Sequence, residues 1–191
     1  MTSQKVFNLI LILSIMLFWI NQSNADVCVW RDPDKAMSKL FPEALDYATI
    51  TKRMTPEVVA RIESVLGSKL DESEKSEFNF YDLRTLKDGK PKSVGTAMAL
   101  AGKGEYGVIE VVIGVDPLGK IHAVYIQRSR ERASKSIKSD AFLAQFIGKS
   151  AVDLLEFGKD IKDLKEAPVG TEAVRLTIKK MLLFFTQKEL A

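Results

Sequence analysis

The pattern of apolar and polar residues changes several times along this chain, and the first change comes early. Residues 6–20 form an apolar run that only Asn8 and Ser14 interrupt. Lys5 precedes the run, and a polar stretch that ends in Ser-Asn-Ala at residues 23–25 follows it. This order is typical of a secretory signal peptide with its cleavage site. Since a membrane-spanning helix needs about 20 apolar residues, we expect residues 1–25 to direct export and to be removed; the alternative is an uncleaved N-terminal anchor.

The next part of the chain has helical spacing. Thr55 is a good N-cap, Pro56 suits the first helical position, and Gly67 ends the apolar repeat, so together they predict a helix between residues 55 and 67. Two shorter elements precede it. One is a helix that stops at Pro42, and the other is a strand over residues 47–52, which are rich in β-branched side chains.

Strands then replace helices. The predicted strands cover residues 78–83, 93–100, 108–115 and 121–127. Between the first two, Asp88-Gly89 is a hairpin signal, because these residues adopt positive φ readily. Short turns join all four strands, so the sequence predicts an antiparallel meander.

Helical spacing returns after the strands. A short helix is expected near residues 140–146, and Thr171 and Glu172 are expected to cap a long final helix. The layout predicts an α+β fold, an antiparallel β-sheet with helices packed on it. We divide the chain into a signal peptide (1–25), an N-terminal extension of helices and a strand (26–77) and a sheet-and-helix domain (78–187).

Composition narrows the possible chemistry. The chain has 191 residues, a formal net charge of +3, one Cys (Cys28) and one His (His122). One cysteine excludes an internal disulfide framework, and the scarcity of both residue types argues against a zinc site. A charge of +3 does not indicate a nucleic-acid partner. His122 lies in a predicted strand without a nucleophile beside it, so no catalytic residue is assigned.

Two features suggest anion binding. The first is a basic cluster after the last strand, which is typical either of an anion or phosphate site or of a solvated strand end. Its members are Arg128, Arg130, Arg132, Lys135 and Lys138. The second is the start of the final helix at Gly170 and Thr171, where free N–H groups would favour a phosphate, or where Thr171 simply caps the helix.

The order of motifs from about residue 78 to 185 resembles the FMN-binding domain. That domain occurs in one subunit of Rnf complexes, in one subunit of sodium-pumping NADH:quinone reductases and in small exported proteins. The resembling segments are Gly-Lys-x-Glu at residues 102–105, Arg-Glu at 130–131, Phe-Leu-x-Gln-Phe-x-Gly-Lys at 142–149, Gly-Lys-Asp-Ile at 158–161 and Ala-Val at 173–174. The resemblance covers more than half of the chain that follows the signal peptide.

One motif departs from the family. Its members have Ser-Gly-Ala-Thr followed by Ser-Ser-x-Ala-Val, and the Thr can hold FMN through a phosphoester bond. In an alignment without gaps, Lys165 and Glu166 replace the Ser and Gly, and Pro168 takes the place of the acceptor Thr. Proline has no hydroxyl, so no phosphoester can form there. Thr171 falls on the second Ser, and only a shifted alignment would make it the acceptor.

The resemblance therefore implies an exported flavoprotein that holds FMN without a covalent bond. The phosphate would meet the start of the final helix, with Lys103 or Arg130 as the counter-charge. The candidate cofactor-binding residues are Lys103, Glu105, Arg130, Glu131, Gly170 and Thr171. Such a protein would transfer electrons with a redox partner protein or within a membrane complex, in the periplasm or at the outer face of the cytoplasmic membrane. The alternative is a flavin-free relative that serves as a binding or assembly module at that face. A small hydrolase is disfavoured, because no nucleophile–base pair is evident.

Overall fold

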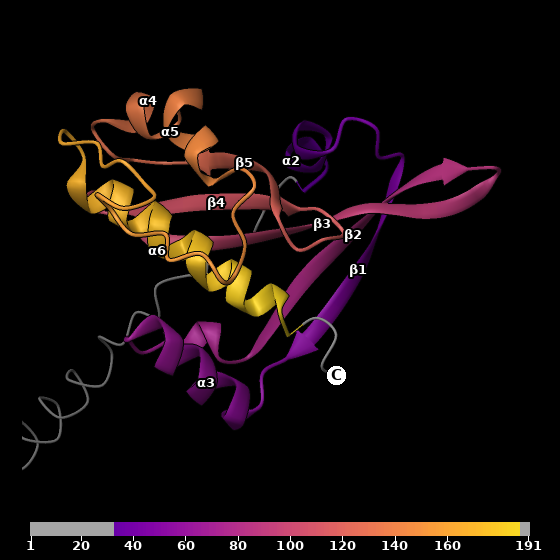
Figure 1. Ribbon diagram of the computed structural model, residues 1–191, viewed down its shortest axis with the longest axis horizontal. Coiled ribbons are helices and arrows are strands. Elements are labelled where there is room, and N and C mark those ends of the chain that lie inside the picture. Colours follow the sequence, from indigo (N-terminus) through magenta and orange to yellow (C-terminus); the bar gives the residue numbers. More distant parts are fainter. Residues whose placement is uncertain (1–32, 188–191) are drawn as a thin grey trace, which may run out of the picture.

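A five-stranded antiparallel sheet forms the centre of the protein (Figure 1). The computed structural model describes residues 33–187, so the predicted signal peptide and Cys28 lie outside the described residues. The strands are β1 (Asp46–Arg53), β2 (Glu77–Lys87), β3 (Lys90–Lys103), β4 (Val108–Val115) and β5 (Ile121–Arg128), paired in chain order. The α+β class and the four-stranded meander are confirmed. The strand expected at residues 47–52 is β1, and it pairs with β2 at the edge of the same sheet.

Helices cover both faces of the sheet. Helix α6 (Pro168–Phe185) packs on β3 and β4 and also contacts α3 (Pro56–Leu66). Three shorter elements, α4 (Ser134–Ile137), α5 (Asp140–Leu143) and η2 (Ala144–Phe146), follow β5 along the chain, and Ile137, Phe142 and Phe146 join the core under α6. Helix α2 (Pro33–Leu40) contacts β4 and β5 and belongs to a second, smaller apolar cluster. The last short element is η1 (Glu72–Glu74).

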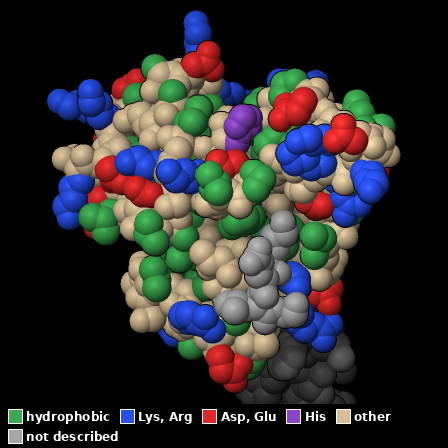
Figure 2. Space-filling model, turned by 45° about the vertical axis from the view of Figure 1, so that its right-hand side comes forward, with side chains coloured by type: hydrophobic (Ala, Val, Ile, Leu, Met, Phe, Trp, Pro, Cys, Tyr) green, Lys and Arg blue, Asp and Glu red, His purple; other side chains and the backbone are tan. Residues whose placement is uncertain are grey.

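Two glycines make room for the end of α2. The ring of Phe41 lies over Gly95 on β3 and Gly114 on β4, where an added Cβ would come within 2.3 Å and 2.6 Å of ring carbons. The same ring stacks on His122 with the ring centres 4.8 Å apart. His122 itself is exposed, and Figure 2 shows it on the surface. The segment before residue 78 is therefore packed on the sheet through α2 and paired with it through β1; the boundary between residues 77 and 78 stays a prediction.

The hairpin between β2 and β3 confirms the predicted turn. Asp88 (φ 53°) and Gly89 (φ 71°) both adopt the left-handed conformation that a tight hairpin turn requires. Both strands are longer than expected, because they continue past the edge of the sheet toward this turn (Figure 1).

The start of α6 differs from the prediction. Thr171 was expected to cap this helix, but the helix begins at Pro168, and Ala167 is the N-cap. The N–H of Thr171 already donates to the carbonyl of Ala167 at 2.9 Å. The fixed φ of proline suits the first helical position, and proline has no N–H to leave unpaired there, so the helix starts at Pro168, four residues earlier than expected. Among residues 33–187, no helix is long and apolar enough to cross a membrane.

Candidate functional site

The predicted site residues lie at one end of the sheet, on the β3–β4 turn, the loop after β5 and the first turn of α6. Glu131 is at the centre and is 5% exposed. One of its carboxylate oxygens, Oε1, accepts a hydrogen bond from the N–H of Tyr106 at 3.0 Å. Its own N–H donates to the hydroxyl of Ser129 at 3.2 Å. The carboxylate therefore points inward, toward the protein, and not toward solvent.

Two glycines let this carboxylate approach so closely. A Cβ on Gly104 would lie 2.3 Å from Glu131 Oε1, and one on Gly170 would lie 3.3 Å from Glu131 Oε2. Gly170 belongs to the first turn of α6, where N–H groups carry partial positive charge. The structure thus brings Glu131 and Gly170 together as expected, but it places a carboxylate of the chain itself beside the helix start that was predicted to receive a phosphate.

Thr171 is fully buried in this first turn. Its hydroxyl lies 2.6 Å from Asp163 Oδ1, 3.0 Å from the carbonyl of Ala167 and 3.2 Å from that of Pro168, and it donates toward these oxygens. A hydroxyl has one proton, and here three acceptor oxygens surround it. Thr171 is therefore a structural residue of the α6 start, and its oxygen is not open to a ligand.

The remaining candidates form an exposed rim. Lys103, Glu105 and Arg130 are exposed, and neither of the two cations forms an ion pair within residues 33–187. The aliphatic part of Arg130 lies beside Gly107, whose φ of 135° and missing Cβ leave space for it. In the described structure, these three side chains do not contact one shared atom or residue.

The rim also contains a residue that sequence reasoning missed. The Tyr106 ring is 40% exposed, and the guanidinium of Arg132 lies 4.6 Å from the ring centre. Burial, followed by a hydrogen bond with Glu105, raises the pKa of Tyr106. The signal for this residue is its place inside the glycine-rich turn at residues 102–107, where an aromatic residue has little core to join. Of the basic cluster, Arg128 lies on β5 and pairs with Glu110 at 3.3 Å, so it does not belong to the rim.

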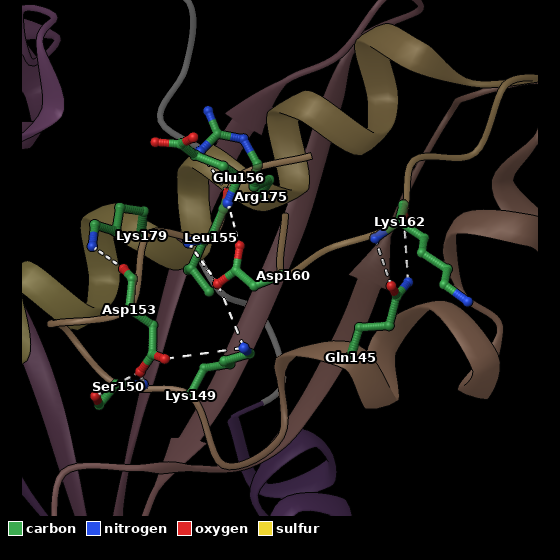
Figure 3. A network of polar contacts seen from close by, with 10 residues as sticks. All are labelled: Gln145, Lys149, Ser150, Asp153, Leu155, Glu156, Asp160, Lys162, Arg175 and Lys179. Carbon is green, nitrogen blue, oxygen red and sulfur yellow. Dashed lines mark hydrogen bonds and ion pairs between the residues drawn. The ribbon is translucent and has the colours of Figure 1, made fainter. Parts of the chain in front are cut away.

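Half-buried charged side chains attach the segment between residues 149 and 162 to α6 (Figure 3). Leu155 is buried and has φ 54°, which is costly for a residue with a branched side chain. The carboxylate of Asp160 accepts the N–H groups of Leu155 at 3.0 Å and Glu156 at 2.6 Å and so holds this turn. Burial raises the pKa of Asp160, but the hydrogen bonds from Glu156 and Leu155 and the nearby Lys149 outweigh that effect, so the net pKa is lowered.

Two cations of α6 complete this attachment. Arg175 donates to the carbonyl of Leu155 at 3.0 Å, and Lys179 donates to the carbonyls of Ala151, at 2.9 Å, and Asp153. Burial lowers the pKa of Lys179. The motif at residues 158–161 that resembles the family therefore orders a backbone segment, and its Asp160 is engaged inside the protein.

The geometry offers few sites for other chemistry. In the part of the chain that the structure describes, no group of three or more His, Cys, Asp or Glu side chains could hold a metal ion. Two open hollows lie along α3, and none of the predicted site residues lines them.

Comparison with known proteins adds no identification. No protein-family model matches the chain, and no curated protein matches it significantly. The functional assignment therefore depends on the residues described above.

Proposed function

We propose that this protein is a flavin-free binding or assembly module at the outer face of the membrane, built on a scaffold that resembles the FMN-binding domain. The observation that supports this proposal most is the closed first turn of α6, where the Glu131 carboxylate lies against Gly170. A helix start attracts an anion because its N–H groups lack partners. Here a glutamate of the protein supplies that anion.

The residues at this turn do not fit a covalently attached flavin. Pro168 has neither a hydroxyl nor an N–H, and the hydroxyl of Thr171 is buried and donates toward Asp163. A flavin phosphate near Gly170 would also face the negative charge of Glu131 at short range, in a place with little water to screen it. These residues support a protein that holds no flavin through a phosphoester.

Non-covalent FMN is the second candidate, and a specific observation favours it. Lys103 lies in the turn that carries Tyr106, Arg130 lies beside Gly107 of the same turn, and both cations are exposed without an ion pair within residues 33–187. Cations could meet a phosphate at this rim, and an aromatic ring could lie against the flavin. When bound, FMN would supply the redox chemistry for electron transfer to a partner protein or membrane complex. In this candidate, Gly170 and Thr171 would not contact the phosphate.

One experiment separates the two candidates. The purified full chain is inspected for flavin absorption and then titrated with FMN while the quenching of flavin fluorescence is followed. We expect a colourless protein without saturable binding. A flavin-coloured protein, or saturable binding, would overturn the flavin-free proposal. In that case, the double variant Lys103→Ala/Arg130→Ala should weaken FMN binding, whereas the matched double variant Lys135→Ala/Lys138→Ala should not.

A covalent adduct would have a distinct signature. It would remain fluorescent on a denaturing gel, and it would contradict the role given to Pro168. Its loss in Thr171→Ala would then identify Thr171 as the acceptor. Its persistence in that variant would point to another residue.

A further inference from the structure

The β2–β3 hairpin continues beyond the rest of the sheet (Figure 1). β1 pairs with β2 only as far as Arg84, and β4 pairs with β3 only from Thr96 onward. From residue 84 to residue 94, no side chain is buried. A two-stranded hairpin on its own is marginally stable in water. Only Val94, at the base of the extension, is half-buried against the small apolar cluster, so packing does not account for the length of residues 85–93.

The tip of this hairpin is basic. Lys87, Lys90 and Lys92 are all exposed, and Asp88 is the only acidic residue among residues 85–92. None of the three lysines forms an ion pair within the described residues. Leu86 is 60% exposed and pairs with Pro91, so it lies at the same tip but on the other face of the hairpin from the three lysines. The projection thus presents positive charge and one apolar side chain at the same end.

We propose that this tip, from Leu86 to Lys92, docks on an anionic phospholipid surface. This proposal rests on the proposed location of the protein at the membrane, and it names the part of the protein that contacts the lipid. It does not depend on whether the protein binds flavin. A tip that projects from the molecule can touch a flat bilayer (Figure 1). Each lysine near an anionic membrane strengthens binding about fivefold, and Leu86 can enter the headgroup region.

Two other roles for these lysines are tested at the same time. Lysine and proline on exposed strand edges prevent pairing with other chains, and Pro91 lies between two of the lysines. The lysines could also meet an acidic protein. Neither role requires a preference for anionic over neutral lipid, so that preference is the discriminating measurement.

The test uses the full chain and two kinds of vesicle, phosphatidylcholine alone and phosphatidylcholine with phosphatidylglycerol. Sedimentation gives the ratio of binding to anionic and neutral vesicles, and the apolar N-terminal run, present in every variant, contributes to both terms of that ratio. The variant Lys87→Ala/Lys90→Ala/Lys92→Ala should reduce the ratio about a hundredfold at low salt, and less at high salt. The matched variant Lys138→Ala/Lys162→Ala/Lys165→Ala removes the same charge from other positions outside the hairpin and should change the ratio little.

A local probe keeps the test decisive if the N-terminal run dominates sedimentation. The emission of Leu86→Trp, after subtraction of the parent protein's spectrum, should shift to the blue with anionic vesicles only. The proposal is overturned if the wild-type ratio of anionic to neutral binding is close to one and the emission of the Trp probe does not shift. It is also overturned if both triple variants reduce the ratio equally. It is also overturned if the tip variant only self-associates, or if poly-glutamate binds through the same lysines while vesicles do not.

Discussion

The buried Glu131 gives the sharpest test of how the α6 start is stabilised. Glu131→Gln keeps an oxygen that can accept the N–H of Tyr106 but removes the charge beside Gly170. A charge at a partly buried helix end contributes up to about 2 kcal/mol, and a hydrogen bond to a charged group exceeds a neutral one by about 1 kcal/mol. We therefore expect Glu131→Gln to lower the free energy of unfolding by about 2 kcal/mol.

Glu131→Ala should cost more. It leaves the N–H of Tyr106 without its acceptor and empties the space between Gly104 and Gly170, so a loss of about 3 kcal/mol is expected. Urea unfolding followed by circular dichroism measures both variants. Glu105→Gln is the matched control, because Glu105 is exposed and its charge change should matter by less than about 0.5 kcal/mol.

A Glu131→Gln variant as stable as the wild type would contradict this prediction. The carboxylate would then gain nothing from the helix start, and Glu131 could not be regarded as the anion that fills this place. The proposal of a flavin-free module would lose its main support in the same measurement.

Three further predictions follow from other contacts. Lys180→Met leaves the buried Glu74 without its cation at 2.7 Å and should cost about 3 kcal/mol in urea unfolding, whereas Glu74→Gln/Lys180→Met should cost less. Because the pKa of Asp160 is lowered, its carboxylate stabilises the folded state fully above about pH 4, and this stabilisation is lost as the pH falls through the folded-state pKa. Asp160→Asn should therefore make the free energy of unfolding depend less on pH in the acid range. An unchanged pH dependence would contradict this. Gly95→Ala would place a Cβ 2.3 Å from the Phe41 ring and 2.8 Å from the carbonyl of Val115 and should lower the melting temperature by several degrees; an unchanged melting temperature would contradict this close packing.

The strands were predictable because each signal was local. Residues 108–115 were expected as a strand and form β4, and the Asp88-Gly89 turn fixed the hairpin. The pairing of β1 with β2 was not predictable, since an edge strand with mostly polar residues has no pattern that names its neighbour. At the final helix, Pro168 and Thr171 are both start signals, and sequence alone does not rank two such signals three residues apart.

Whether the six candidate residues bind a cofactor stays a prediction, and their geometry was not predictable from the sequence. In the structure Glu131 lies against Gly104 and Gly170, and Arg130 lies beside Gly107. The inward direction of Glu131 depends on the approach of Gly104 and Gly170, which are far apart in the sequence. The sequence is the same whether the glutamate side chain faces a bound ligand or occupies the ligand's place. Only the packing distinguishes these two cases.

The position of α2 sets an order for the assembly of the fold. This helix is the first described element to be synthesised, yet Phe41 needs Gly114 and His122, and Lys39 donates to Tyr125, 86 residues later. Contacts of such high sequence separation form slowly, since the intervening chain must first be made and folded. We expect α2 to pack last, after the strands have already paired to form the sheet. Until then, the small apolar cluster beneath it stays open to other molecules.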